Sequence, residues 1–302
     1  MLKYRLTLGP IFVLAALGLS WLDGWLDIQP APGWMHRFVA NGTWPPGVFI
    51  FLIVAFLTVV AACELTVILR SKGVAASRRM NSILAVSGLL LGALIPEEWS
   101  GMGAAGLINA SVAMVLIVSL VVYSRKQQVE GMIAAAGGSL LSFCYLGLLF
   151  AFLIMIRREH PVWVMLWVLL VTKSCDIGAF FTGITIGRHK LIPWLSPGKT
   201  WEGLIGGLIT SAAVAAGGAL LLPRVCPEGT PLPSWQASII AGLLFGAVGQ
   251  LGDLLASLLK RDAGVKDAGR SLPGFGGMLD LIDSVVLVGP FAFWWLRLAT
   301  AG

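Results

Sequence analysis

The chain has 302 residues, of which 57% are hydrophobic and only 12% are Asp, Glu, Lys or Arg, and its mean hydropathy is +0.88. Soluble domains are about 25% charged, so this composition excludes an ordinary soluble globular protein and indicates an integral membrane protein. The formal net charge of +6 is less informative than the places where the basic residues lie.

Apolar runs of about 20 residues can cross a bilayer as helices. About nine runs of this kind predict helices over 6–22, 47–69, 82–95, 102–123, 132–156, 161–186, 203–222, 235–258 and 278–299. Because an open sheet edge cannot face lipid, we predict an all-α, polytopic membrane helix bundle. It would form one domain over residues 1–302, with less recognisable N-terminal spans in 1–160 and the polar motifs in 161–302.

The N-terminus has the charged start and apolar stretch of a signal peptide but no clear Ala-x-Ala cleavage site, so we predict an uncleaved first span. The four cysteines do not make a disulfide framework, and we expect them to be packing residues.

Lys and Arg residues are unevenly distributed between the predicted spans. One alternate set of connecting segments holds 15 of them and the other set holds 5. The positive-inside rule then predicts a cytoplasmic N-terminus and an external C-terminus. Both polar loops, 187–202 and 259–277, would lie on the cytoplasmic face, where nucleotides are found.

A carboxylate lies in the middle of the predicted span 161–186. Asp176 follows Lys173 by one helical turn, and a charge at membrane depth normally faces a partner, a metal or a water-filled cavity. A structural pair with Lys173 and a carboxylate that reaches a cytoplasmic cavity are both open interpretations. Gly178, Gly183 and Gly187 would let this helix pack closely on a neighbour.

The segment 196–207, SPGKTWEGLIGG, offers Lys199, Thr200 and Glu202 directly before a Gly-rich span. It is not a nucleotide-binding P-loop, because Pro193 replaces the first required glycine and no strand precedes it. The segment either contributes polar groups to a binding site or is a capped helix start, with Ser196 or Thr200 as the cap.

Asp253, Ser257 and Lys260 share one helical face because they are spaced by four and three residues. Gly246, Gly249 and Gln250 precede them on the same span, so a polar stripe is predicted at its end. A simple helix end with an acid–base pair and a snorkelling Lys260 and Arg261 is the alternative.

The segment 266–277, KDAGRSLPGFGG, cannot continue a helix through Pro273-Gly274 and Gly276-Gly277. A Gly-rich turn that leads into a helix can bind phosphate through its amide groups and the positive helix end. A plain turn is the alternative. Because basic residues flank the turn, a triphosphate site is a hypothesis. These residues are Lys260, Arg261, Lys266 and Arg270.

Asp280 and Asp283 open the last predicted span and project to the same side of it. Two carboxylates beside a basic, Gly-rich loop suit Mg²⁺, which is held by one or two carboxylates together with substrate phosphates. The alternative is that both acids only favour the positive helix N-terminus.

Residues 257–283 resemble the signature of the phosphatidate cytidylyltransferase, or CDP-diglyceride synthase, family. The shared features are a Ser-x-x-Lys-Arg start, a Lys-Asp pair, a Pro-Gly-x-Gly-Gly turn and paired Asp residues. The segments 176–191 and 196–207 resemble the family in the same order. Phe275 and Leu281 stand where the family usually has His and Arg.

The resemblance implies a nucleotidyltransferase that moves CMP from CTP to phosphatidate, giving CDP-diacylglycerol and pyrophosphate in phospholipid biosynthesis. By analogy, Asp253 and Asp280 would hold Mg²⁺, with a second monovalent or divalent cation as an option, and Asp283 would orient a lysine such as Lys199. The implied substrate-binding residues are Ser257, Lys260, Arg261, Lys266, Asp267, Gly274, Gly276, Gly277, Thr200, Glu202 and Asp176.

The expected partners are CTP, phosphatidate or a related lipid phosphate, and membrane lipids, with a homodimer as an option and no nucleic acid. The expected location is the cell (inner) membrane, with the active site on the cytoplasmic side. Two alternatives stay open. One is another CTP-dependent lipid transferase, such as a polyprenol kinase or a CDP-archaeol-type synthase, and the other is a transporter of a phosphorylated anion.

Overall fold

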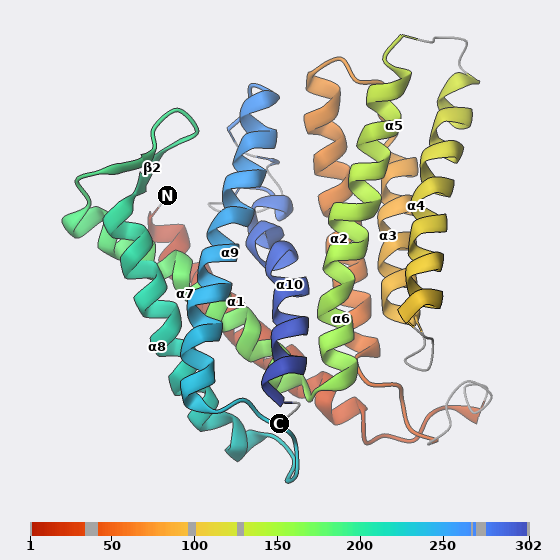
Figure 1. The fold of residues 1–302 in the computed structure, drawn as a ribbon. Coiled ribbons are helices and arrows are strands. Elements are labelled where there is room, and N and C mark those ends of the chain that lie inside the picture. Colours follow the sequence, from red (N-terminus) through yellow and green to blue (C-terminus); the bar gives the residue numbers. More distant parts are fainter. Residues whose placement is uncertain are drawn as a thin grey trace. The chain divides into compact units, whose positions relative to one another are not determined.

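A computed structural model describes residues 2–33, 42–95, 101–125, 130–266, 268–269 and 276–300, with the backbone alone for residues 2–10 and 12. The described part of the chain is almost entirely helical (Figure 1). The elements are α1 (Leu2–Leu26), α2 (Val48–Ser71), α3 (Arg78–Leu94), α4 (Gly101–Ser124), α5 (Met132–Leu141), the π-helix η2 (Ser142–Leu148), α6 (Leu149–Glu159), α7 (Val162–Ile186), β1 (Lys190–Ile192), β2 (Ser196–Thr200), α8 (Trp201–Val225), α9 (Trp235–Asp262) and α10 (Met278–Thr300).

A helix coincides with each predicted apolar span within the described residues. Seven helical stretches of this part of the chain are long and apolar enough to cross a membrane, and α5, η2 and α6 form one of them as a continuous helix. The prediction of a helical, multi-pass membrane protein is therefore confirmed. The count of nine spans and the cytoplasmic N-terminus stay predictions, since α3 has only 17 residues.

The antiparallel hairpin β1–β2 is an exception to the all-α prediction. It occupies the polar segment between α7 and α8, where the sequence already predicted a loop outside the apolar spans. A strand edge is costly only where lipid surrounds it, so the hairpin is compatible with a membrane protein.

The contacts divide the chain into two compact units. Unit 1 comprises Met1–Val54, Leu153–Leu251 and Pro290–Gly302, and unit 2 comprises Ala55–Phe152 and Gly252–Gly289. The division falls within α2, α6, α9 and α10. A single membrane domain divided near residue 160 stays a prediction.

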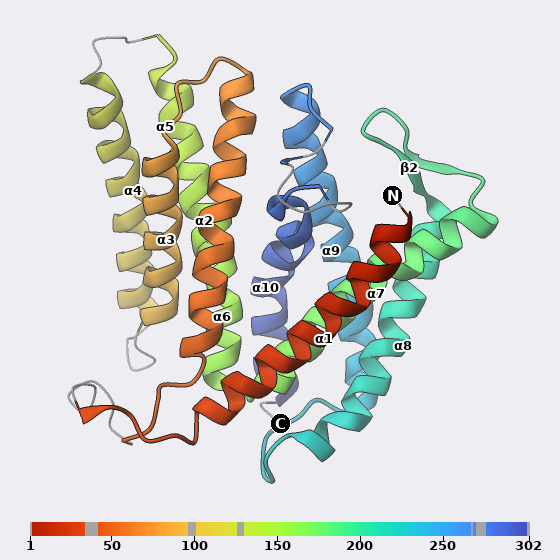
Figure 2. The same cartoon turned by 180° about the vertical axis from the view of Figure 1, so that it is seen from behind.

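In unit 1, α7 and α8 pack closely through small residues, and α1 runs along α7 (Figure 2). A Cβ atom added to Gly207 of α8 would lie 2.7 Å from the carbonyl oxygen of Cys175, and one added to Gly178 of α7 would collide with Thr210. The expectation that Gly178 allows close helix packing is confirmed, because only glycine leaves room for these contacts.

A buried ion-pair network ties together the segments of unit 1 near the end of α6. Arg157 is 2% exposed and its Nε donates to Asp23 Oδ2 at 2.6 Å, while its second terminal nitrogen pairs with Asp27. Asp23 also accepts a hydrogen bond from the backbone N–H of Ile50 at 3.0 Å. Arg157 is one of the 5 basic residues in the smaller set of connecting segments, and the structure makes it a structural cation of the interior.

Unit 2 contains a chain of buried polar side chains that joins α2, α3, α4 and α5. The Tyr123 hydroxyl lies 3.3 Å from Ser139 Oγ, which donates to Asn81 Oδ1 at 2.8 Å. Asn81 donates to Thr66 Oγ1 at 2.9 Å. Because each member has a partner, this network costs little despite its burial and fixes the register of the four helices.

The π-helix η2 lies directly against α3 in unit 2. A Cβ atom on Gly147 would be 2.6 Å from the Ala85 carbonyl oxygen, and one on Gly88 would be 2.6 Å from the Phe143 carbonyl oxygen. The two helices therefore meet backbone to backbone, which larger residues would prevent.

Three of the predicted basic segments lie at one end of unit 2. Ser71, at the end of α2, donates to the carbonyl of Ala263 after α9 at 3.3 Å. The N–H of Ser77, before α3, donates to Tyr123 at the end of α4 at 3.0 Å. Within unit 2 this arrangement agrees with the alternation of basic residues, while the side of the membrane stays a prediction.

Candidate active site

The start of α10 is held by a carboxylate from a distant part of the chain. Glu64 of α2 is 6% exposed, and its two oxygens accept the N–H groups of Met278 at 3.0 Å and Leu279 at 2.8 Å. These amides have no partner within the helix, and the negative charge favours the positive helix end. Sequence reasoning missed Glu64, although its signal is plain, because it is the one acid in the span 47–69.

The glycines of the turn before α10 give Glu64 its space. A Cβ atom on Gly269 or on Gly277 would lie 2.5 Å from a Glu64 carboxylate oxygen. Gly276 has a φ of 93°, which favours glycine. The backbone amides in the described part of the Gly-rich turn therefore lie against carboxylates of this same chain.

Lys260 and Asp280, both predicted site residues, form a shielded ion pair. Lys260 Nζ lies 2.5 Å from Asp280 Oδ1, with side-chain exposures of 11% and 12%. Asp280 Oδ2 also accepts the N–H groups of Ala268 at 3.0 Å and Gly277 at 2.9 Å. Asp280 is therefore both a cap of the α10 N-terminus, as one alternative predicted, and the partner of a buried cation.

The acids of α9 and α10 lie where these helices approach closely. A Cβ atom on Gly252 would be 2.7 Å from the Asp283 carbonyl oxygen. Asp283 is 2% exposed, and Asp253, next to Gly252, is partly buried. Of the other predicted residues, Ser257 is partly buried, Arg261 and Lys266 are exposed, and Asp267 and Gly274 lie outside the described residues.

The donor set on α9 and α10 is compatible with a magnesium ion that arrives with its substrate. Within the described residues, no group of three or more His, Cys, Asp or Glu side chains forms a ready-made metal cage. Mg²⁺ needs only one or two carboxylates when phosphates and water complete its shell. Asp253 and Asp280 are the carboxylates that would supply such oxygens, and Asp280 already accepts a cationic partner in Lys260.

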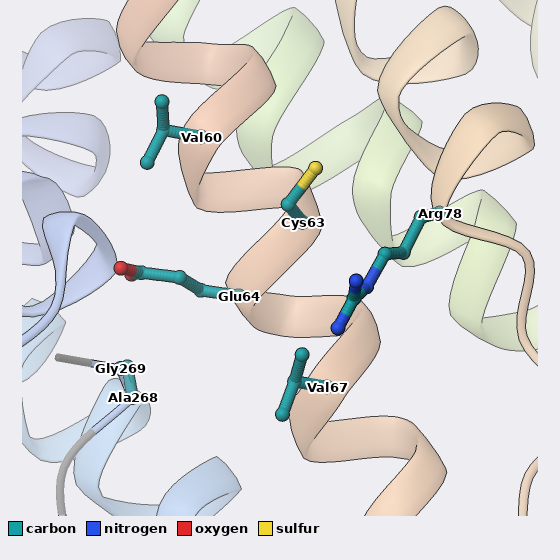
Figure 3. Close-up of a pocket in the computed structure, with 7 residues that line it drawn as sticks. All are labelled: Val60, Cys63, Glu64, Val67, Arg78, Ala268 and Gly269. Atoms are coloured by element: carbon teal, nitrogen blue, oxygen red, sulfur yellow. The ribbon is translucent and has the colours of Figure 1, made fainter. Parts of the chain in front are cut away.

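A cavity of about 390 Å³ lies beside the Glu64 contact in unit 2 (Figure 3). Figure 3 shows the Glu64 side chain extending toward Ala268 and Gly269 and away from Arg78. The lining residues are Val60, Cys63, Glu64, Val67, Arg78, Ala268 and Gly269.

Unit 1 brings two other predicted residues together through an amide side chain. Lys199 Nζ of β2 donates to Gln250 Oε1 of α9 at 2.8 Å, and Gln250 Nε2 donates to Asp176 Oδ1 of α7 at 2.8 Å. Lys173 lies 3.5 Å from the other Asp176 oxygen, and both side chains are about one-third exposed. The predicted Lys173–Asp176 pair is thus present within a larger polar cluster.

Thr200 and Glu202 fix the junction between the hairpin and α8. Thr200 Oγ1 accepts the N–H of Gly203 at 3.1 Å and is therefore the cap of α8, rather than Ser196. Glu202 accepts the backbone N–H groups of Arg188 and His189 and lies 2.6 Å from the His189 ring. The contacts of both residues in this structure therefore position the hairpin and the start of α8.

Apolar helices long enough to cross a membrane, with shielded charges at the end of α9 and the start of α10, define the class of this chain as a multi-pass membrane protein. A model of the cytidylyltransferase family matches residues 33–299, which is most of the chain. The chain belongs to the cytidylyltransferase family, whose members are nucleotidyltransferases.

Several curated proteins are similar to this chain. A phosphatidate cytidylyltransferase of Bacillus subtilis is 33% identical over 265 residues, which cover 83% of this chain and 96% of that protein. A phosphatidate cytidylyltransferase of Haemophilus influenzae is 38% identical over 44% of this chain and 45% of that protein. The uncharacterized protein YnbB of Escherichia coli is 45% identical, and the match spans 44% of this chain and 42% of that protein.

Proposed function

We propose that this chain is a phosphatidate cytidylyltransferase, which transfers CMP from CTP to phosphatidate and releases pyrophosphate. The observation that carries the proposal is the buried Lys260–Asp280 pair beside a Gly-rich turn. The pair lies in a chain of which 83% matches a relative named for this activity, and the match covers 96% of that relative. The lipid phosphate oxygen forms the new bond to the α-phosphorus of CTP as the bond to the β-phosphate breaks.

The chemistry asks the protein mainly to position reactants and to neutralise developing charge. Lys260, Arg261 and Lys266 are the cations proposed to bind the triphosphate. Lys260 is well shielded from solvent, and its attraction to an incoming phosphate would be weakly screened. Ser257 and the turn residues Asp267, Gly274, Gly276 and Gly277 are proposed to line the same site.

Asp253 and Asp280 are the proposed ligands of Mg²⁺, whose positive charge, when bound, would offset the charge of the phosphates. Their carboxylate chemistry supports this assignment. A second cation is part of the same proposal. Asp283, which is buried in α10, is proposed to orient a lysine, and Lys199 is the candidate.

The polar cluster of unit 1 is proposed to hold further substrate groups. Lys199 is fixed by its bond to Gln250, and Gln250 is fixed in turn by Asp176. A pre-positioned ammonium loses less conformational entropy when it binds a phosphate than a mobile one does. Thr200 and Glu202 would support Lys199 by fixing the hairpin and the start of α8.

The proposed location is the cell (inner) membrane, with the active site on the cytoplasmic side, and the distribution of basic residues supports this orientation. Membrane lipids would surround the helices, and phosphatidate would reach the site from the bilayer. A homodimer stays a prediction.

The Asp280→Asn variant tests the proposed function. We expect purified wild-type protein to transfer α-labelled CMP to phosphatidate only with a divalent cation, and the variant to lose about 100-fold or more of this rate. Thermal unfolding in detergent should show that the variant is folded. Asp262→Asn is the control, since Asp262 is 79% exposed. Near-normal transfer by Asp280→Asn would contradict the metal assignment, and transfer of γ-label instead would indicate a kinase.

A further inference from the structure

Tyr145 of η2 carries a buried polar group that the described structure leaves unsatisfied. Its side chain is 8% exposed, and its hydroxyl has no hydrogen-bond partner among the described residues. Buried polar groups in native proteins nearly always have a partner, so each exception requires an explanation. A substrate that supplies the missing partner is one such explanation.

The packing of η2 determines the direction in which Tyr145 points. Phe143 and Gly147 make the backbone contacts with α3, and Tyr145 lies two positions from each of them. Two positions along a helix correspond to about half a turn, so Tyr145 lies on the side of η2 away from α3.

Two carboxylates of unit 2 come near enough to Tyr145 for their charges to act on it. The charges of Asp253 and Asp283 both act on the Tyr145 hydroxyl. Gly252 approaches the Asp283 backbone closely, so α9 and α10 meet at this level. The Tyr145 hydroxyl, which has no partner among the described residues, is therefore within electrostatic reach of two of the predicted catalytic acids.

The irregular backbone of η2 also supports a functional role. The N–H of Leu149 donates to the carbonyl of Cys144, five positions earlier. π-helical turns are rare within α-helices and occur frequently at functional sites. The wider turn changes the side on which Tyr145 projects, compared with a continuous α-helix.

We propose that Tyr145 is a substrate-binding residue whose hydroxyl donates a hydrogen bond to a phosphoryl oxygen bound beside Asp253 and Asp283. A phenol is a neutral donor, so it can bind an anionic oxygen at this depth without a further buried charge. The identity of the phosphate rests on the proposed function. The oxygen belongs either to the nucleotide or to the lipid phosphate, and the two sources are separable by experiment.

The test compares Tyr145→Phe with Tyr123→Phe. Each variant loses one hydroxyl from unit 2, but the Tyr123 hydroxyl has partners in Ser77 and Ser139. For both variants and the wild type, the melting temperature in detergent would be measured with Mg²⁺ alone and with Mg²⁺ plus CTP, pyrophosphate or short-chain phosphatidate. The KM and kcat of CMP transfer would be measured separately for CTP and phosphatidate.

For Tyr145→Phe we expect an unchanged melting temperature without phosphate ligand, but a smaller increase with one ligand class, equivalent to about tenfold weaker binding. The KM for the same substrate should rise about tenfold, with a smaller change in kcat. A loss confined to CTP and pyrophosphate assigns the bond to the nucleotide, and a loss confined to phosphatidate assigns it to the lipid. Tyr123→Phe should lower the starting melting temperature and keep every ligand-induced increase.

Wild-type ligand responses in Tyr145→Phe would overturn the proposal, as would an equal loss in Tyr123→Phe or a wild-type protein that no phosphate ligand stabilises. If the wild type binds a phosphate ligand but transfers no CMP, the proposed function fails on its own. The ligand-induced increase in melting temperature then still decides the role of Tyr145.

Discussion

Glu64 shows how much a single side chain can position at this site. Its carboxylate satisfies the first two amides of α10, and two glycines leave it room. Asp280 follows these amides directly in the chain, so the orientation of its carboxylate depends on where α10 begins. Glu64 is thus a positioning residue for the Lys260–Asp280 pair.

We expect Glu64→Gln to destabilise the protein by about 1–3 kcal/mol, because an amide has one acceptor oxygen and leaves one buried N–H without a partner. CMP transfer should fall with it. Thermal unfolding in detergent and the transfer assay measure both effects. Glu228→Gln is the matched control, since Glu228 is exposed in the segment after α8. Equal melting temperatures for the two variants would contradict the assigned role of Glu64.

His160, between α6 and α7, makes the stability of the protein depend on pH. Burial lowers the pKa of His160 below its ordinary value of 6.5, against an opposing effect of Glu159. The folded protein therefore binds this proton less readily than the unfolded chain. The contribution of neutral His160 to stability should be fully present above about pH 6.5 and should be lost as the pH falls through the lowered folded-state pKa.

Melting temperatures between pH 7.5 and 5 measure this loss. His160→Gln should show a smaller decrease over the same range, because glutamine does not titrate. His189→Gln is the comparison, since His189 is exposed. A decrease of the same size in wild type and His160→Gln would show that other groups cause it.

Sequence reasoning could find the motif residues but not all of their partners. Lys260 and Asp280 could be predicted as site residues because charged residues are rare in this apolar chain, and the structure shows that they form an ion pair. Glu64 binds backbone amides more than 200 positions away. Every residue except proline has a backbone amide, so no sequence pattern reveals which amides are bound. Tyr145 resembles any core aromatic residue in sequence, since only the structure shows that its hydroxyl lacks a partner.

Among the elements, η2 depends on glycine for its contact with α3. Gly147→Ala should destabilise the protein by about 1–3 kcal/mol, because the new Cβ would lie 2.6 Å from the Ala85 carbonyl oxygen. Gly137→Ala, on the preceding helix α5, meets no atom within 4 Å and should be neutral or stabilising by about 0.5–1 kcal/mol. Thermal unfolding of both variants checks the difference, and equal effects would count against the close packing of η2 on α3.

Hydropathy predicted the positions of the helices but not their irregularities. Each apolar run coincides with a helix in the described chain, because apolar length alone decides whether a segment can be buried in lipid. The π-turn of η2 and the hairpin β1–β2 arise from hydrogen bonds, which leave no trace in average hydropathy. The sequence left two candidates for the N-cap of α8, Ser196 and Thr200, and the hydrogen bond from the N–H of Gly203 identifies Thr200.

For the whole molecule, the number of membrane crossings decides which loops share a side. Five predicted spans separate Ala75 from Glu228, so the two residues should lie on opposite faces. In a chain without its native cysteines, Ala75→Cys should react with an impermeant reagent from the cytoplasmic side only, and Glu228→Cys from the external side only. Both positions are exposed. Labelling from one and the same side would show that one of the five helices, such as the 17-residue α3, does not cross.

The class of the whole molecule followed from composition and charge placement. The chain has too few charged residues for a soluble domain, which predicted a multi-pass membrane protein. The family match agrees with the motif resemblance. The division into two units could not be predicted, because it runs through the middle of continuous helices and leaves no linker in the sequence.

The contact between Glu64 and α10 also constrains how the protein is made. Glu64 leaves the ribosome 214 residues before Met278, so its carboxylate enters the bilayer long before its amide partners exist. An acid at that depth is unfavourable without a partner. Unit 2 can therefore complete its folding only when the final helix has inserted. A nascent chain truncated before Met278 should be a substrate for quality-control proteases.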